Sequence, residues 1–245
     1  MLSNTFAVAA RIYRQLIGDR RFLALSTLMP LVVLYLFKVF INALPVSLFT
    51  DPEMFYVLVT TFIVHFVSYV LCLIVIVRER REETLARMFV NNFSRTDIVL
   101  GYLLGYAGLA TLQAVLILGG MEYLFHLSYG PGLMLSIFAV IWTLAMISIA
   151  LGMMISNLAK TEAQVFPFIP LFILPTIFLS GLILPLESLP WSARWISYLI
   201  PLTYALEILR PLIEEGTSLF QNFWILIAYG LILLGLASMT LRQRQ

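Results

Sequence analysis

Charged residues are scarce in this chain. Asp, Glu, Lys and Arg make up 11% of its 245 residues and apolar residues make up 61%, whereas about a quarter of an average soluble domain is charged. A soluble fold of this length could not cover so much apolar surface, because its outside must face water. A lipid bilayer solvates apolar side chains directly. The composition therefore excludes an ordinary soluble protein and predicts an integral membrane protein.

Motifs that carry enzymatic chemistry are also missing. The single cysteine, Cys72, excludes an intrachain disulfide and suggests no cysteine-based metal site. The two histidines, His65 and His126, are far apart and stand in no H-E-x-x-H motif, and no G-x-S-x-G sequence is present. No G-x-x-x-x-G-K-S/T loop occurs either, so another chain would have to bind any ATP that is used. We therefore expect no catalytic residue, cofactor site or metal site in this chain, and no nucleic-acid partner.

What the chain does contain is a series of apolar runs. A helix needs about 20 mostly apolar residues to cross the hydrocarbon core of a bilayer. Continuous runs without period-two alternation favour helices over barrel strands. We therefore predict an all-α membrane protein whose transmembrane domain covers residues 22–245. Its six predicted transmembrane helices are Phe22–Leu44, Phe55–Val77, Ile98–Met121, Leu133–Ser156, Val165–Leu184 and Phe223–Leu241.

Basic residues gather in the loops on one side of these predicted spans. An even number of spans places both termini on that side, and an excess of Lys and Arg marks the cytoplasmic side of a membrane. Arg194 and Arg210 fall on the opposite side, while Lys38 lies inside the first span and can extend outward. We therefore expect a multi-pass protein of a prokaryotic cytoplasmic membrane, with both termini in the cytoplasm. The basic residues on the predicted cytoplasmic side are Arg11, Arg14, Arg20, Arg21, Arg78, Arg80, Arg81, Arg87, Arg95, Lys160, Arg242 and Arg244.

Residues 1–21 precede the first apolar run and have the pattern of an amphipathic helix. Such a helix lies in the cytoplasmic interface with its arginines toward anionic headgroups, and so late an apolar run does not fit a cleavable signal peptide. Two interpretations remain open: an ordinary membrane anchor, or a platform on which Arg11 and Arg14 also clasp a cytoplasmic partner. The apolar positions expected to share one side of this helix are Phe6, Ala9, Tyr13, Leu16 and Ile17.

The segment 78–97, RERREETLARMFVNNFSRTD, is rich in charge. Glu83 and Arg87 are spaced for an i,i+4 ion pair, and Ser94 with Asp97 fits a capping box at the start of the next span. We predict a second helix that lies on the cytoplasmic surface with charges available for contact. The alternative is a solvated charge run that only fixes topology. The apolar positions at helical spacing are Leu85, Met88, Phe89 and Phe93.

The external side contains one long segment, residues 185–221. Two helix-like stretches, Trp191–Ile200 and Leu202–Leu212, are separated by Pro201, and each is too short to span a membrane. Aromatic residues favour the membrane–water interface, so we predict a re-entrant or interfacial hairpin on the outer leaflet. The first external loop, around Pro45–Glu53, is short, and no sizeable extracellular domain is expected. The aromatic residues of the hairpin are Trp191, Trp195, Tyr198 and Tyr204.

Small residues predict a close helix contact on the third span. Gly101 and Gly105 form a G-x-x-x-G pair, with Gly108 nearby. Small residues let helix backbones approach closely in lipid, so we expect another helix to pack here.

Polar and helix-breaking residues inside the spans suggest where a substrate could pass. His65 lies near the middle of the second span, where an ionisable residue is a candidate functional group. A neutral imidazole hydrogen bonded to a neighbouring helix is the simpler interpretation. Prolines in the fifth span predict a kink or unwinding that only protein or a cavity can tolerate. The residues expected near the pathway are His65, Pro167, Pro170 and Pro175.

Two longer stretches resemble the ABC-2 family of transporter permeases. The stretch from Glu79 to Tyr106, ERREETLARMFVNNFSRTDIVLGYLLGY, is similar to the family's charged loop entering a glycine-containing third span. The stretch from Leu179 to Arg210, LSGLILPLESLPWSARWISYLIPLTYALEILR, is similar to its Ser-Gly, Pro, Leu-Pro, Pro-Leu-Thr-Tyr and Glu-x-x-Arg series. The resemblance covers essentially the whole chain. One departure is Glu83, because the family often has Gly before the Thr.

The resemblance implies a half-transporter. Two permease subunits would pair, and two ATP-binding cassette ATPase subunits, which carry ATP and Mg, would dock from the cytoplasm. We expect the second permease to be another copy of this chain, with a sister chain as the alternative, and membrane lipids as further partners. By resemblance, Arg80–Val90 would be the coupling helix that inserts into a groove of the ATPase. Its expected contact residues are Arg80, Glu82, Glu83, Thr84, Leu85, Arg87, Met88 and Phe89.

Spans that are aromatic and poor in polar groups favour an amphiphilic drug or lipid as the exported substrate. Polysaccharide, sodium or haem-related export within the same family stays open. A secondary carrier would need internal repeats and acidic groups inside the spans. An enzyme or scaffold would need a catalytic cluster or a large interaction domain. The sequence has none of these features, so the exporter permease is the favoured hypothesis.

Overall fold

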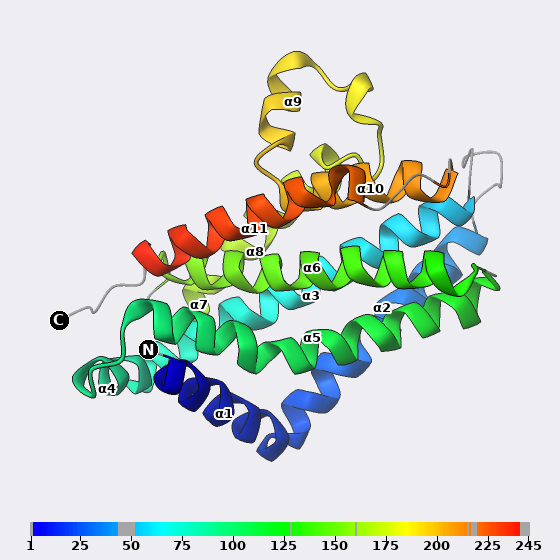
Figure 1. The fold of residues 1–245 in the computed structure, drawn as a ribbon. Coiled ribbons are helices and arrows are strands. Elements are labelled where there is room, and N and C mark those ends of the chain that lie inside the picture. The colour runs from blue at the N-terminus through cyan, green and yellow to red at the C-terminus, as the bar shows by residue number, and fades with distance from the viewer. Residues whose placement is uncertain are drawn as a thin grey trace.

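The structure is a computed structural model in which every regular element of the described residues is a helix (Figure 1). This confirms the all-α prediction. The described residues do not include Lys160, Arg242, Arg244 or most of the predicted loop Pro45–Glu53. The structure describes residues 2–43, 52–127, 129–159, 161–214, 216 and 220–240. The helices are α1 (Leu2–Gly18), α2 (Arg20–Asn42), α3 (Pro52–Arg81), α4 (Thr84–Val90), α5 (Arg95–Phe125), α6 (Pro131–Ser156), α7 (Glu162–Val165), α8 (Phe168–Leu179), α9 (Trp191–Ser197), α10 (Pro201–Glu214) and α11 (Phe220–Thr240), with a 3-10 turn, η2 (Leu186–Ser188).

Five helices of the described chain, α2, α3, α5, α6 and α11, are long and apolar enough to cross a membrane. Local sequence sets where two of them begin. Asp19 accepts a hydrogen bond of 3.0 Å from the backbone of Phe22 at the start of α2. Ser94 and Asp97 form the predicted capping box at the start of α5. The predicted capping box is therefore confirmed, while the cap at Asp19 is a further helix-start signal that sequence analysis did not single out.

The predicted fifth span, Val165–Leu184, is wrong in length. Its longest helix, α8, has 12 residues, because Pro167 has no N–H group to continue the helix from α7. Beyond α8 the chain turns through Gly181, whose φ of +89° is a conformation that glycine adopts at little cost. A sixth crossing within the described residues exists only if α9 and α10, which meet at 94°, count as one bent span.

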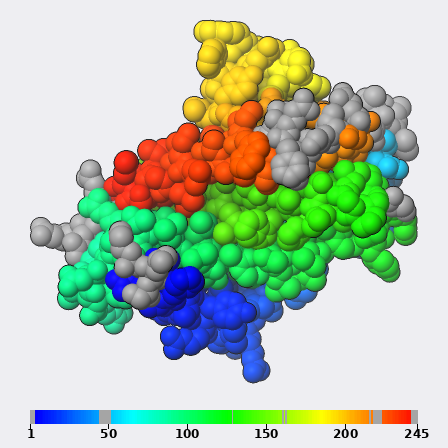
Figure 2. Space-filling view, in the orientation of Figure 1, coloured from blue at the N-terminus to red at the C-terminus, as the bar shows by residue number. Residues whose placement is uncertain are grey.

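The two short helices expected in the external hairpin are present as α9 and α10. They differ in environment: α10 packs along α3, α6 and α11, whereas α9 projects away from the long helices (Figures 1 and 2). Trp191 and Trp195 on α9 are 76% and 61% exposed. The hairpin therefore has one half inside the bundle and an aromatic half outside it.

Helix α3 is the centre of the bundle. Within its most apolar window 72% of the residues are buried, against 22% for α2 and for α11. Its closest neighbour is α6, where a Cβ on Gly152 would lie 2.8 Å from the carbonyl oxygen of Tyr69. Gly152 therefore permits direct backbone contact between two spans, as small residues do in membrane helices.

Helix α1 packs on α5 along the predicted glycine pair. A Cβ on Gly101 would lie 2.5 Å from Val8 Cβ, and one on Gly105 would lie 2.7 Å from Ile12 Cβ. The predicted apolar side of α1 is therefore wrong. Val8 and Ile12 face α5 and are buried, as is Leu16. Of the other residues predicted for that side, Phe6, Tyr13 and Ile17 are exposed and Ala9 is half-buried.

Candidate coupling surface and membrane cavity

One end of the bundle contains helix α4, the ends of α3, α6 and α11, and the starts of α1 and α5 (Figure 1). We call this region the α4 end. Thr5 on α1 donates to Asp97 on α5 at 3.1 Å, and Arg95 on α5 donates to the carbonyl oxygen of Met239 on α11 at 3.4 Å. These contacts show that segments far apart in the sequence meet there.

The chain reverses direction between α3 and α4 at Glu83. This residue has φ = 58° and ψ = 14°, a left-handed conformation that costs a residue other than glycine about 1–2 kcal/mol. The expected Glu83–Arg87 ion pair is wrong, because Glu83 precedes α4 rather than occupying one of its turns. Arg87 instead donates to the carbonyl oxygen of Glu82 at 2.8 Å, and Glu82 pairs with Arg78 at 3.0 Å.

Helix α4 is shorter than the expected coupling helix Arg80–Val90, because α3 continues to Arg81. It packs on α3, and Leu85 and Met88 are only 5% and 8% exposed. The apolar side chains expected to anchor a partner therefore face the bundle. Thr84 and Phe89 are half-buried, while Val90 is 77% exposed and lies beside exposed Ala86 and Arg87.

Arg80, another expected contact residue, is bonded within the chain. Its Nη1 donates to the carbonyl oxygen of Ser156 at 2.7 Å and to that of Ala159 at 3.3 Å. Its Nη2 donates to Asn157 Oδ1 at 2.7 Å and to Ser156 Oγ at 3.5 Å. The guanidinium group therefore caps the last turn of α6, whose terminal carbonyls have no partner within the helix.

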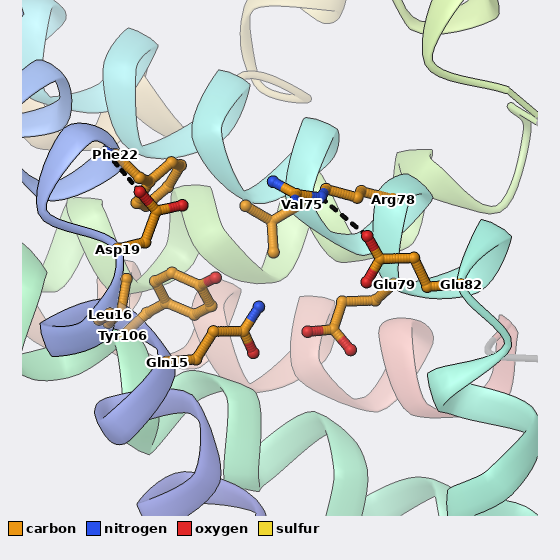
Figure 3. Close-up of a pocket in the computed structure, with 9 residues that line it drawn as sticks. All are labelled: Gln15, Leu16, Asp19, Phe22, Val75, Arg78, Glu79, Glu82 and Tyr106. Atoms are coloured by element: carbon orange, nitrogen blue, oxygen red, sulfur yellow. Dashed lines mark hydrogen bonds and ion pairs between the residues drawn. The ribbon is translucent and has the colours of Figure 1, made fainter.

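Arg11 and Arg14, the two residues expected to clasp a partner, differ in their surroundings. Arg11 forms an ion pair with Glu79 of α3, whose side chain is 4% exposed. Beside it a pocket of about 30 Å³ lies between α1, the start of α2, α3 and α5, and Figure 3 shows Gln15, Glu79 and Tyr106 around it. Arg14 is exposed and donates to the carbonyl oxygen of Ala10 in its own helix. Arg11 therefore connects α1 to α3, and Arg14 faces outward.

A second feature is a cavity of about 240 Å³ between α3, α6, α8 and the α9–α10 junction. Two of the four expected pathway residues, His65 and Pro175, line it. Pro167 and Pro170 do not line it; they lie at the start of α8, where proline is tolerated. The lining residues are His65, Phe66, Tyr69, Leu151, Leu171, Phe172, Ile173, Pro175, Thr176, Ile196, Leu199, Ile200 and Pro201.

His65 is also hydrogen bonded to a neighbouring helix, as the simpler interpretation expected. Its Nδ1 lies 2.7 Å from Ser148 Oγ on α6. The Ser148 hydroxyl donates to the carbonyl oxygen of Leu144 at 2.6 Å, so it accepts from His65 Nδ1. This arrangement leaves Nε2 as the acceptor nitrogen of a ring that lines the cavity.

Sequence analysis missed the partners that give these residues their positions. Glu79 and Asn157 were not singled out, although a buried carboxylate and an amide beside arginines are suited to charge-assisted bonds. Tyr69 and Phe172 were missed in the cavity. Tyr69 follows His65 by four residues, and this helical spacing is the signal that could have found it.

Comparison with known proteins identifies a family. The sequence profile of the ABC-2 type transporter family matches residues 3–213. The chain is 26% identical over 190 residues to the probable multidrug ABC transporter permease YbhS of Escherichia coli (strain K12), covering 75% of this chain and 50% of that protein. It is 25% identical over 160 residues to the linearmycin resistance permease protein LnrN of Bacillus subtilis (strain 168), covering 64% and 41%. It is 27% identical over 150 residues to ABC transporter G family member 20 of Dictyostelium discoideum, covering 61% and 20%.

The chain thus spans between a fifth and a half of the length of these relatives. The family profile covers most of this chain. The matched residues 3–213 include α1, the turn between α3 and α4, the residues that line the cavity, and α9. The resemblance drawn from the sequence is confirmed. This multi-pass membrane chain therefore belongs to the ABC-2 type transporter family.

Proposed function

We propose that this chain is the permease subunit of an exporter and that a separate ATP-binding cassette subunit hydrolyses the ATP. The observation that carries the proposal is the α3–α4 reversal, where a short helix is held on the bundle with Arg87 and Val90 exposed. ATP and Mg then belong to the partner, and this chain contributes no catalytic group. Family membership supports the proposal, as do relatives named as a probable multidrug permease and a linearmycin resistance permease.

The α4 end would face the cytoplasm. Arginine is concentrated there, and positive residues favour the cytoplasmic side of a membrane. In contrast, the opposite end of α5 carries the exposed acidic residue Glu122. An ATP-binding subunit in the cytoplasm could therefore reach α4. The arginines of the α4 end are Arg11, Arg78, Arg80, Arg81, Arg87 and Arg95, and Arg14 lies farther along α1.

Docking would use the exposed side of α4 rather than its buried side. Ala86 and Val90 are one helical turn apart and offer apolar contact area, while Arg87 offers a charge at its rim. Exposed Arg14 on α1 would extend the contact. Closure of the ATP-binding subunits would then shift α4, and the spans attached to it, as a rigid body.

The cavity would hold the substrate. Its lining is aromatic and aliphatic apart from His65, Tyr69 and Thr176, so it suits an amphiphilic drug or lipid that has an apolar body and one hydrogen-bonding group. A polysaccharide would need many more polar partners. The prolines and the short length of α8, which forms one wall, would let that wall move during transport.

Two copies of the chain would form the transporter. The outer side of α8 exposes Leu171, Leu174 and Phe178, which are 61%, 52% and 56% exposed. The same helix lines the cavity, so a second copy seated on this side would complete the wall of the substrate site. The remaining apolar surface of the spans would contact membrane lipids.

The experiment is co-purification of a tagged chain with its ATP-binding subunit from mild detergent. Arg87→Glu combined with Val90→Asp should abolish co-purification, because it places two acidic groups on the docking side. Glu122→Arg is the matched control, since it reverses a charge at the opposite end of the bundle, and it should leave the complex intact. An intact complex with the double variant would contradict docking through α4.

A further inference from the structure

Arg80 connects the last turn of α3 to the end of α6 by four hydrogen-bond contacts. Three acceptors lie within 2.7–3.3 Å of its guanidinium nitrogens, and Ser156 Oγ lies at 3.5 Å. A planar guanidinium with several occupied donors holds its geometry more firmly than a single ammonium group would. The side chain also stands only four positions before Thr84, the first residue of α4.

The contact continues from α6 to α11. Asn157 accepts from Arg80 through Oδ1, and its Nδ2 donates to Thr240 Oγ1 at 3.2 Å. We call this group, Arg80, Ser156, Asn157, Ala159 and Thr240, the Arg80 node. It joins the ends of three long helices, α3, α6 and α11.

We propose that Arg80 is a positioning residue that transmits displacement of α4 to the ends of α6 and α11. The proposal rests on the proposed function, since the partner subunit is what displaces α4. The link between α3 and α4 has only two residues, Glu82 and Glu83, outside the two helices, and α4 packs on α3, so a displacement of α4 would act directly on the end of α3. Movement of α3 must then either pull the end of α6 with it or break the bonds of Arg80. Both α6 and α3 line the substrate cavity, so this node connects the docking surface to the cavity walls.

A direct role of Arg80 in binding the ATPase is the competing assignment implied by the family resemblance. The structure favours the internal role, because the guanidinium is partly buried and both of its terminal nitrogens already donate to residues at or just beyond the end of α6. Turning outward would leave the carbonyls at the end of α6 without these bonds. The two roles predict different results, because a contact residue affects docking, whereas a transmitting residue affects transport by the docked complex.

The test uses the complete transporter reconstituted with its ATP-binding subunit. Transport per ATP hydrolysed is compared for wild type, Arg80→Ala, Arg80→Lys and Asn157→Ala. Arg78→Ala is the matched control, because it removes a cation two residues away whose ion pair with Glu82 is exposed. We expect Arg80→Ala to dock and hydrolyse ATP while transport per ATP falls on the order of 2- to 30-fold. Arg80→Lys should recover part of the loss, Asn157→Ala should show a smaller loss, and Arg78→Ala should match wild type.

Two results would overturn the proposal. One is an unchanged transport-to-ATP ratio in Arg80→Ala, and the other is loss of ATPase binding by that variant, which would make Arg80 a docking contact. If Arg80→Ala does not fold, an unchanged ratio in both Arg80→Lys and Asn157→Ala overturns it equally. Failure of the proposed function is recognised separately, because wild type itself would then bind no ATP-binding subunit.

Discussion

Arginine side chains bind backbone carbonyl oxygens both at the α4 end and in the segment of η2 and α9, but the bonds span very different numbers of residues. Arg80 binds oxygens of residues that are 76–79 positions away, and Asn157 binds Thr240 over 83 positions. Arg194 binds oxygens of residues only 5–8 positions away, and Thr203 binds Ser197 over 6. The α4 end is therefore held to several helices by these bonds, whereas the bonds of Arg194 and Thr203 hold α9 and η2 to neighbouring turns of the same segment.

This difference predicts different motions. A region whose hydrogen bonds are local can open or shift as a unit without disturbing the rest of the fold. Helix α9 contacts α8 and η2, and Tyr229 of α11 donates to the carbonyl oxygen of Leu199 just beyond it. The α4 end cannot move without α6 and α11. A displacement at α4 should therefore spread through the bundle, while α9 can respond separately.

The largest expected effect is at the buried ion pair of the α4 end. Glu79→Leu leaves Arg11 without its partner, and loss of one member of a buried pair costs about 3–5 kcal/mol. Because Arg11 is 31% exposed, we expect the low end, about 3 kcal/mol, measured as the free energy of unfolding in detergent. The matched control is Glu82→Leu, whose pair with Arg78 is exposed and worth under about 1 kcal/mol. Equal losses in the two variants would contradict a special role for Glu79.

The next effect concerns the contact of α1 with α5. Gly101→Ala would bring a methyl group to 2.5 Å from Val8 Cβ, and overpacking of this kind costs about 1–3 kcal/mol. We expect faster proteolysis of α1 together with lower stability. Gly119→Ala, on the same helix with nothing within 4 Å, is the control and should be neutral or slightly stabilising. A resistant α1 in the Gly101 variant would show that the helices are not in close contact.

Loosening the hairpin should have a smaller and local effect. Arg194→Ala removes bonds to three carbonyl oxygens, and hydrogen bonds to charged groups contribute about 1.5–3 kcal/mol. We expect faster amide hydrogen exchange in α9 and η2 and no change in the thermal midpoint of the bundle. Arg80→Ala should instead speed amide hydrogen exchange at the end of α6 and leave exchange in α9 unchanged. Faster exchange throughout the bundle in the Arg194 variant would remove the distinction between the two regions.

The smallest effect is expected at the reversal before α4. Glu83→Gly places glycine at a left-handed position, which relieves side-chain strain but adds chain entropy in the unfolded state. We expect stability to rise by less than about 1 kcal/mol, with docking unchanged. Glu82→Gly, at the neighbouring position that does not have a positive φ, is the control and should be destabilising. A marked loss in Glu83→Gly would mean that its carboxylate is needed.

Much of the fold follows from the sequence because membrane helices need long apolar runs. Local sequence signals mark the starts of α2 and α5. They also mark the two short helices α9 and α10 and the glycine contact between α1 and α5. The break at Pro167 also had a signal, but the length of α8 did not, because it depends on Gly181 and on the space left by α9 and α10.

The candidate site was less predictable, because its geometry depends on long-range partners. The charges and apolar spacing of 78–97 indicated a helix, yet nothing local shows that Leu85 and Met88 face the bundle. Nor does the spacing around Arg80 reveal that its acceptors lie on α6. The position of Glu83 is instructive: a positive φ explains why glycine suits this place in the family, but the sequence alone could only note the departure.

The central claim is that the exposed side of α4 contacts a separate ATP-binding subunit. It is tested most directly by cross-linking from single cysteines in a Cys72→Ser chain, whose own cysteine is buried. Val90→Cys on α4 is compared with Tyr123→Cys, which is 78% exposed at the opposite end of α5. The account predicts an adduct with the ATP-binding subunit from position 90 and none from position 123. An adduct from position 123, or none from position 90 in a complex that still hydrolyses ATP, would contradict it.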